Sequence, residues 1–221
     1  MSVDQHTMYI PEHFEERDVA VLHALVRSHP LGTWVTEVGE RLVVNHIPFI
    51  LDSTRGPLGT LRGHVARANP VWKAAPSQVE SVVVFQGPQA YITPSWYLAK
   101  QEHGKVVPTW NYAVVHAHGM PRVIDEPEWL RQLVVELTGV HEAGRETPWS
   151  VSDAPSNYID TMLRAIVGIE IPIASLIGKW KASQNRSVPD RLGVIAGLNE
   201  SADSESKQMA RLVRERTKST G

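Results

Sequence analysis

The feature that most constrains the fold is a succession of short β-branched and aromatic runs between Gly32 and Ile124. The runs are bounded by turn residues, which is typical of strands. They cover Thr33–Val38, Leu42–Leu51, Leu61–Ala66, Ser81–Gln86, Ala90–Thr93, Val107–His118 and Pro121–Ile124. Because few helical patterns interrupt them, they predict an antiparallel meander that forms a closed or partly closed barrel.

Two turns predict how neighbouring runs pair. Gly39-Glu40, between the first two runs, is a hairpin signal, and Gly119-Met120, between the last two, is a weaker one. Both connections are short, so they favour antiparallel pairing of adjacent strands.

Helical or strand patterns flank this region on both sides. Glu15–Ser28 predicts one helix with acidic residues in its first turn. Asp125–Glu142 predicts a second helix that packs on the barrel, with Asp125 as its N-cap ahead of Pro127. Val167–Ile177 predicts another strand, and Ser187 begins a short helix that ends at Leu198.

The end of the chain differs in composition. Asn199–Ser206 is rich in serine and acidic residues and reads as a linker, whereas Lys207–Lys218 predicts a short basic helix. We therefore expect one domain with flanking helices over residues 1–198, followed by a polar linker and a basic helix over residues 199–221.

Composition excludes several classes of protein. The 221 residues are 42% hydrophobic with a net charge of −2, so the chain can bury one large core and has no global attraction for nucleic acid. It has no cysteine, which rules out disulfides and thiolate chemistry. We expect a cytoplasmic protein, since no apolar run is long enough for a membrane span or a signal peptide.

Four short segments combine aromatic and polar residues, a mixture that residues packed only inside a barrel do not need. They are His64–Trp72, Tyr91–Tyr97, Val107–Tyr112 and Gly178–Asn185. Aromatic rings can stack on a flat cofactor, hydroxyl and amide groups can address its heteroatoms, and cations can hold a phosphate. The candidate cations are Arg67, Lys100 and Lys181, and the candidate polar donors are Thr93, Ser95, Ser183, Gln184 and Asn185. These residue types alone leave a flavin, a haem and a nucleotide open.

The four segments, preceded by Met8-Tyr9-Ile10-Pro11-Glu12-His13-Phe14, resemble the PaiB-like family of FMN-binding negative transcriptional regulators. The resemblance covers roughly residues 8–197. It implies an antiparallel FMN-binding split β-barrel related to pyridoxamine-phosphate oxidases and flavin reductases. It also implies a homodimer with the flavin at the subunit interface and a function in negative transcriptional regulation, with flavin-linked redox sensing as one form of it.

The resemblance further implies a set of FMN-binding residues. Arg67 and Lys181 are expected to face the phosphate, Thr93 and Ser95 to donate to phosphate or ribityl oxygens, and Trp110 to border the ring. The complete set is His64, Arg67, Asn69, Thr93, Ser95, Trp96, Tyr97, Trp110, Asn111, Lys181, Gln184 and Asn185.

Other functions stay open at this point, and whether the chain is an enzyme is one of the open questions. One alternative is an FMN-dependent oxidoreductase acting on a small substrate. A second is a haem-binding or haem-degrading split-barrel protein with His64, His116 or His118 as axial ligand. A third is a repressor that contacts DNA through the basic C-terminal helix, although no helix-turn-helix pattern accompanies it. His116 and His118 share a strand face, but without an evident third ligand we expect no metal site.

Overall fold

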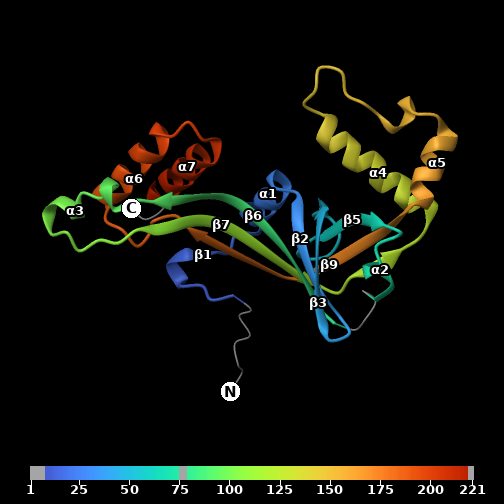
Figure 1. Ribbon diagram of the computed structural model, residues 1–221, viewed down its shortest axis with the longest axis horizontal. Coiled ribbons are helices and arrows are strands. Elements are labelled where there is room, and N and C mark those ends of the chain that lie inside the picture. Colours follow the sequence, from blue (N-terminus) through green and yellow to red (C-terminus); the bar gives the residue numbers. More distant parts are fainter. Residues whose placement is uncertain (1–7, 75–78, 219–221) are drawn as a thin grey trace. The chain divides into compact units, whose positions relative to one another are not determined.

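The structure is a computed structural model that describes residues 8–74 and 79–218 (Figure 1). Nine strands form its sheet: β1 Glu15–Glu16, β2 Leu31–Val38, β3 Arg41–Pro48, β4 Ile50–Asp52, β5 Thr60–Ala66, β6 Ser81–Ile92, β7 Thr109–Gly119, β8 Arg122–Ile124 and β9 Ile166–Lys181. The α-helices are α1 Val19–Ser28, α2 Val71–Ala74, α3 Ala99–Glu102, α4 Pro127–Glu142, α5 Ser156–Arg164, α6 Val188–Glu200 and α7 Ser204–Lys218. Three 3-10 turns complete it: η1 Glu12–Phe14, η2 Pro94–Trp96 and η3 Val151–Asp153. None of the described helices is both long and apolar enough to span a membrane.

The sheet is antiparallel and follows the order β3-β2-β6-β7-β9-β5-β4, with β1 and β8 also paired to β9. The hairpin predicted at Gly39-Glu40 is confirmed by the pairing of Val38 with Arg41. The hairpin predicted at Gly119-Met120 is wrong, because β8 pairs with β9, where Arg122 lies opposite Glu170. Both edges of β7 are already occupied, by β6 and β9, so β8 has no free edge of β7 to join.

Three predicted element boundaries are also corrected. Glu15 and Glu16 do not begin the first helix; they pair with β9, and the helix starts at Val19. The run Leu42–Leu51 is interrupted at Phe49, whose N–H donates to the carbonyl oxygen of Pro30 instead of to a strand partner. The two runs predicted between Ser81 and Thr93 form one continuous strand, β6. Pro88 does not interrupt it, because β2 pairs only with Val82–Val84, and a proline without a backbone N–H is tolerated beyond that ladder.

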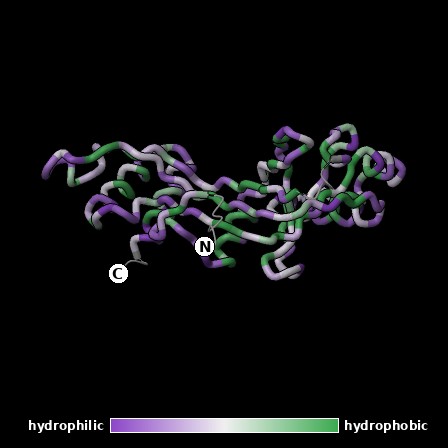
Figure 2. The backbone as a smooth tube through the Cα atoms, turned by 90° about the horizontal axis from the view of Figure 1, so that it is seen from below, coloured by the Kyte–Doolittle hydropathy of each residue, from purple (hydrophilic) through white to green (hydrophobic). Residues whose placement is uncertain are grey.

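The chain divides into two compact units. Unit 1 contains residues 1–18, 86–115 and 177–221, and unit 2 contains residues 19–85 and 116–176, so β6, β7 and β9 contribute to both. Figure 2 shows hydrophobic and hydrophilic residues interleaved along the strands, which is the alternation expected when only one face of a strand enters a core.

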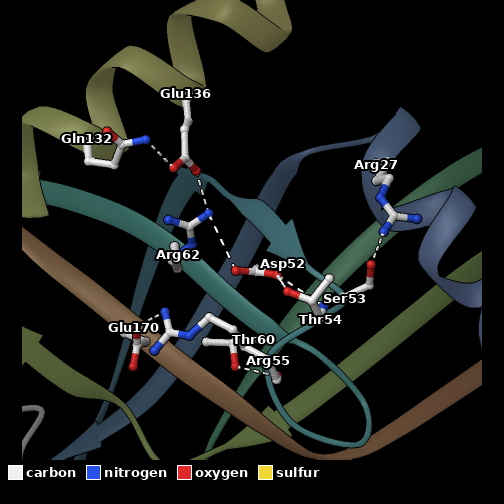
Figure 3. A network of polar contacts seen from close by, with 10 residues as sticks. All are labelled: Arg27, Asp52, Ser53, Thr54, Arg55, Thr60, Arg62, Gln132, Glu136 and Glu170. Atoms are coloured by element: carbon white, nitrogen blue, oxygen red, sulfur yellow. Dashed lines mark hydrogen bonds and ion pairs between the residues drawn. The ribbon is translucent and has the colours of Figure 1, made fainter.

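In unit 2, α4 packs beside β5 as predicted, and ionic contacts reinforce this apolar packing. Leu130, Leu133 and Leu137 are the buried residues of α4. In Figure 3, Arg62 of β5 lies between two carboxylates: it is paired with Glu136 of α4, and its Nη2 lies 3.8 Å from Asp52 Oδ2. The predicted N-cap of α4 is wrong. Glu126 holds that position without a side-chain bond, because Asp125 pairs with Arg67 instead.

Helix α5 was not predicted, and its apolar face explains why. Its nine residues bury only Ile159 and Leu163, which contact Leu130 of α4 in a small cluster. Two buried positions on a short segment are too few for a periodic signal.

In unit 1, α6 and α7 pack together and form most of the helical core. Ser187 accepts from the N–H of Asp190 at 3.3 Å, which confirms the predicted start of α6. α7 begins at Ser204, so the predicted linker shrinks to residues 201–203. Met209 and Val213 of α7 are completely buried. Burial of one such side chain contributes about 1.5–3 kcal/mol, which holds α7 against the core.

Two glycines of α6 allow η2 to approach the helix. A Cβ on Gly193 would lie 1.9 Å from the carbonyl oxygen of Trp96, and one on Gly197 would lie 2.2 Å from its indole ring. We expect Gly193→Ala to lower the free energy of unfolding by roughly 1–2 kcal/mol, because overpacking costs about 1–3 kcal/mol and outweighs a helix-propensity gain of about 1 kcal/mol. Chemical denaturation measures the change. Gly139→Ala in α4 is the control, since nothing lies within 4 Å of its Cβ, and it should be neutral or stabilising. Equal effects of the two substitutions would contradict the close approach.

Candidate functional site

The twelve residues predicted to bind a cofactor fall into two groups. His64, Arg67 and Asn69 belong to unit 2, and the other nine belong to unit 1. The nine gather on three segments of unit 1: the turn after β6, the start of β7, and the end of β9 with the residues that follow it.

The start of β7 and the end of β9 are joined by two side-chain hydrogen bonds. Lys181 Nζ donates to Thr109 Oγ1 at 2.6 Å, and Asn111 Nδ2 donates to Ser183 Oγ at 2.8 Å. Asn111 is completely buried, and its Oδ1 has no hydrogen-bond partner. Ser183 has a φ of 63°, a backbone conformation that non-glycine residues rarely adopt and that often marks functional sites.

Three cations cluster around this point without a carboxylate partner. Lys179 Nζ donates to the Tyr9 carbonyl oxygen and lies 5.6 Å from the ring centroids of both Tyr9 and Tyr112. Arg186 lies over the ring of Tyr97. Neither these two residues nor Lys181 forms an ion pair with any residue that the structure describes. Burial, together with the like charges of Lys179 and Arg186, lowers the pKa of Lys181.

An aromatic wall lies on the face of β7 opposite the side chain of Asn111. Trp110, Tyr112 and Val114 alternate along the strand and line a cavity of about 280 Å³ together with Gln86 and Gln89 of β6. The indole N–H of Trp110 donates to Gln89 Oε1 at 3.0 Å, although 49% of the Trp110 side chain is exposed. Tyr91 meets the Trp110 ring edge-on at a centroid distance of 6.0 Å. A flat ring system held half-exposed in this way is available to a ligand.

The second predicted segment is mainly occupied by its own turn. Thr93 Oγ1 accepts from the N–H of Ser95, and Ser95 Oγ accepts from Lys100 Nζ at 3.1 Å. Trp96 packs against α6, and Tyr97 is buried in the core of unit 1. Ser95 is exposed with its hydroxyl, as is Tyr91, and Lys100, which follows the segment, is exposed with its charge.

Gln184 and Asn185 follow the strained residue Ser183. Gln184 closes the turn, because its Oε1 accepts from the N–H of Ala182 and its Nε2 donates to the carbonyl oxygen of Trp180. Asn185 is exposed. Gln184 therefore stabilises the backbone that presents Lys181 and Ser183.

In unit 2, Arg67 and Asn69 bind the protein's own groups. The guanidinium of Arg67 pairs with Asp125 and donates to the carbonyl oxygens of Arg164 at 2.7 Å and Ile166 at 2.9 Å. Asn69 Nδ2 donates to Asn45 Oδ1 at 2.7 Å. These contacts fix the loop after β5, and whether Arg67 also faces a phosphate stays a prediction.

The three candidate haem ligands, His64, His116 and His118, lie at two different places in unit 2. His64 lines a pocket under α4, where burial lowers its pKa. The rings of His116 and His118 lie 6.3 Å apart on β7, and His118 Nδ1 lies 3.6 Å from Glu80 Oε2. Among residues 8–74 and 79–218, no three His, Asp or Glu side chains form a group that could hold a metal ion.

Comparison with known proteins gives this arrangement its context. Residues 8–175 match a family described as "Putative FMN-binding domain". The chain belongs to this FMN-binding family. It is 36% identical to an uncharacterised protein of Emericella nidulans over 95% of this chain and 97% of that one, and 30% identical to the Bacillus subtilis protease synthase and sporulation protein PAI 2 over 96% and 99%.

The fold has solved counterparts as well. The FAD and haem binding protein from Mycobacterium smegmatis superposes with a TM-score of 0.56 at 16% identity, covering 76% of this chain and 73% of that one. The predicted fold class, a mainly antiparallel split barrel with flanking helices, is confirmed by this likeness, as is the PaiB-like resemblance. The described sheet runs from β3 to β4 without closing into a barrel. The cofactor of the family is FMN, as the resemblance predicted.

The residues of unit 1 fit two parts of FMN. Trp110 and Tyr112 offer flat faces to a tricyclic ring, and the unpaired cations around Lys181 suit a phosphate. Asn111 points to the opposite, buried face of β7, so its orphaned Oδ1 is not presented to a ring on Trp110. When bound, FMN supplies electron-transfer chemistry, which no side chain of the protein provides.

Sequence reasoning missed four of the residues that complete this arrangement, namely Thr109, Lys179, Arg186 and Gln89. Lys179 alternates with Lys181 around Trp180, and this spacing places both lysines on one face of a strand. That signal was available from the sequence. The other three are recognisable only by their contacts.

Arg67 provides a direct test of the unit 2 group. We expect Arg67→Ala to lower the free energy of unfolding, because two carbonyl groups lose a hydrogen-bond donor and Asp125 loses its ion-pair partner. Denaturation and an FMN fluorescence titration should be run on the same variant. Weakened FMN binding at unchanged stability would show instead that Arg67 contacts the phosphate.

Proposed function

We propose that this chain binds FMN as a homodimer and acts as a negative transcriptional regulator whose signal is the redox state of the flavin. The main support is the B. subtilis relative, which aligns over nearly the whole of both chains and whose name links it to protease synthesis and sporulation. The observation on the molecule that carries the proposal is the cluster of unpaired cations beside the aromatic wall.

In this proposal Lys181 holds the FMN phosphate. Its ammonium group is partly buried, and among the described residues only the hydroxyl of Thr109 accepts from it, so an incoming phosphate gains a charge-assisted contact without displacing a carboxylate. Lys179 and Arg186 add positive potential at the same place. Trp110 then borders the ring.

This assignment predicts a pH dependence of FMN affinity. Because burial and like charges lower the pKa of Lys181, the free protein loses this proton at a lower pH than an ordinary lysine does. Phosphate binding favours the charged form, so affinity should be full below the lowered pKa and should fall as the pH rises through it. Fluorescence titrations across the alkaline range measure the effect. Lys181→Arg should remove this fall, and a fall that persists in the arginine variant would contradict the assignment.

The homodimer is supported by an exposed apolar face on unit 2, which we call the valine face: Leu31, Val35, Leu42, Val44, Val82 and Val84. Val35 pairs with Val44 on one side and with Val82 on the other, so the three side chains form a row across three strands. Leu42 is 74% exposed and Val44 is 53% exposed. Thr33, Glu37 and His46 also lie on this face, so its apolar centre is the row of Val44, Val35 and Val82. An exposed apolar row of this kind is typical of an interface between subunits.

Direct DNA contact through α7 has weaker support. Arg216 of this helix pairs with Glu16, and Met209 and Val213 are buried, which leaves Lys207, Arg211 and Arg214 as exposed cations of the described side chains. Three exposed cations offer few phosphate contacts. We therefore favour regulation that acts through a partner or a metabolite over direct operator binding.

A transcript comparison tests the regulatory proposal. The gene is deleted in its host and restored as the wild type, as Lys181→Ala, or as Arg211→Gln with Arg214→Gln. We expect a set of transcripts to rise on deletion, to return to normal with the wild type and the double variant, and to stay raised with Lys181→Ala. Unchanged transcripts on deletion would contradict the proposal, and failure of the double variant alone would favour direct DNA binding.

An FMN-dependent oxidoreductase is the second candidate, and the cavity beside Trp110 favours it. That cavity is open and has room for a small substrate next to the aromatic wall. Steady-state oxidation of NADH or NADPH by the FMN-loaded protein separates the candidates, because a sensor turns over slowly without a dedicated acceptor whereas an oxidoreductase shows saturable turnover.

A further inference from the structure

A second pocket lies in unit 2, under the C-terminal half of α4. It has a volume of about 350 Å³ and is lined by Pro48, His64, Val134, Leu137, Thr138, His141, Glu142 and Trp149. The volume is within the range of pockets that bind small organic molecules. Its walls come from the β3–β4 corner, β5, α4 and the loop after α4, so four separate segments build it.

Trp149 is held at this pocket although much of its ring faces solvent. Its side chain is 45% exposed, while its backbone N–H donates to Glu142 Oε2 at 3.1 Å. Glu142 Oε1 in turn accepts from Arg145 Nε at 2.9 Å. A large aromatic ring that is fixed through its backbone but only partly covered is available to stack on a ligand.

The imidazole of His64 defines the polar end of the pocket. Its Nδ1 is buried without a hydrogen-bond partner, so the ring reaches the pocket by the edge that carries Nε2. An orphaned buried N–H is rarer than an orphaned acceptor, which places the proton of the neutral ring on Nε2. Burial lowers the pKa of His64 and keeps this neutral form at physiological pH. The ring therefore offers a single N–H donor to whatever occupies the pocket.

The remaining lining carries no uncompensated charge. No lysine or arginine lines the pocket, and both carboxylate oxygens of Glu142 already accept hydrogen bonds from Arg145 and Trp149. Pro48, Val134 and Leu137 are apolar. An anion would find no cation here, and a metal ion would need Nε2 as a lone-pair donor with the buried Nδ1 protonated and unpaired. The chemistry is that of an uncharged ring with a hydrogen-bond acceptor.

We propose that this pocket binds a planar, uncharged aromatic carbonyl compound, whose ring stacks on Trp149 and whose carbonyl oxygen accepts from His64. Leu137 and Val134 form the floor, and the hydroxyl of Thr138 is a second donor for a ligand with two carbonyl groups. None of its lining residues belongs to the FMN residues proposed in unit 1. His64 then belongs to this ligand and not to the flavin.

Equilibrium dialysis of 1,4-naphthoquinone against the FMN-loaded protein tests the proposal. The chain has no cysteine, so the quinone cannot add to a thiol. We expect saturable binding of one quinone per chain, weakened roughly tenfold in His64→Leu and in Trp149→Ala, as the loss of one hydrogen bond or one stacking contact implies. His64→Gln, which keeps a donor, should restore most of the affinity. Tyr158→Ala is the control, because it removes another half-exposed ring of unit 2 outside the pocket.

FMN titrations of the same variants make the test decisive. If the proposal holds, FMN affinity is the same in His64→Leu and in the wild type, and excess FMN does not displace the quinone. Absence of saturable quinone binding, or equal binding by His64→Leu, would overturn it. Loss of FMN binding in His64→Leu, or displacement of the quinone by FMN, would also overturn it and would assign His64 to the flavin.

Discussion

Replacing Lys181 by alanine is expected to weaken FMN binding roughly tenfold to a hundredfold, which is the effect of losing one charged hydrogen bond of about 1.5–3 kcal/mol. The reason is that Lys181 is the partly buried cation at the end of β9 whose only described partner is the hydroxyl of Thr109. Flavin fluorescence quenching at neutral pH measures the affinity directly. The folding of the variant is checked by its thermal unfolding.

Lys105→Ala is the matched control for this experiment. Lys105 lies in unit 1 but is exposed in the loop between α3 and β7, so its loss should change FMN affinity by less than about twofold. Equal FMN affinities of the Lys181 variant and the wild type would show that the FMN phosphate does not bind at the end of β9. Lys100, beside Ser95, and Arg67 would then be the remaining candidate phosphate ligands.

Replacing Val44 by aspartate is expected to separate the subunits. If the valine face is the interface, symmetry places the new carboxylate twice in an apolar contact, at a cost of several kcal/mol each without a partner. The dissociation constant of the dimer should rise at least roughly a hundredfold. Sedimentation velocity should then show a monomer at micromolar concentration.

Val188→Asp controls for the charge itself. Val188 is 49% exposed, close to the exposure of Val44, and it begins α6, where an acidic side chain is favourable. This variant should remain a dimer and bind FMN as the wild type does. A dimer that persists in Val44→Asp would show that the valine face is not the interface.

The patterns of the sequence predicted the strands well because alternation is a local property. β2, β3, β5 and β7 lie within a few residues of the predicted runs, and α4 and α6 begin close to the expected positions. The failures concern pairing and not strand formation. The chain does not reverse at Gly119-Met120, since β8 goes on to pair with β9, the strand that β7 also borders, and no local signal reveals this continuation.

The candidate site was predictable by residue type and less so by role. Lys181, Trp110 and Asn111 were singled out from their segments, and the structure brings them to adjoining strand ends. Trp96 lies in a segment with the same mixture of aromatic and polar residues, yet it packs against Gly193 and Gly197 of α6. The difference lies in a contact roughly a hundred residues away along the chain, which a short segment cannot encode.

The central claim is that this chain is an FMN-binding dimer, and native mass spectrometry of the protein mixed with FMN tests it most directly. The account predicts one dominant species of two chains with two FMN molecules, and loss of FMN from that species in Lys181→Ala. A folded protein that carries no FMN at saturating concentration would contradict the account, and a monomer that binds FMN as tightly would contradict its dimer.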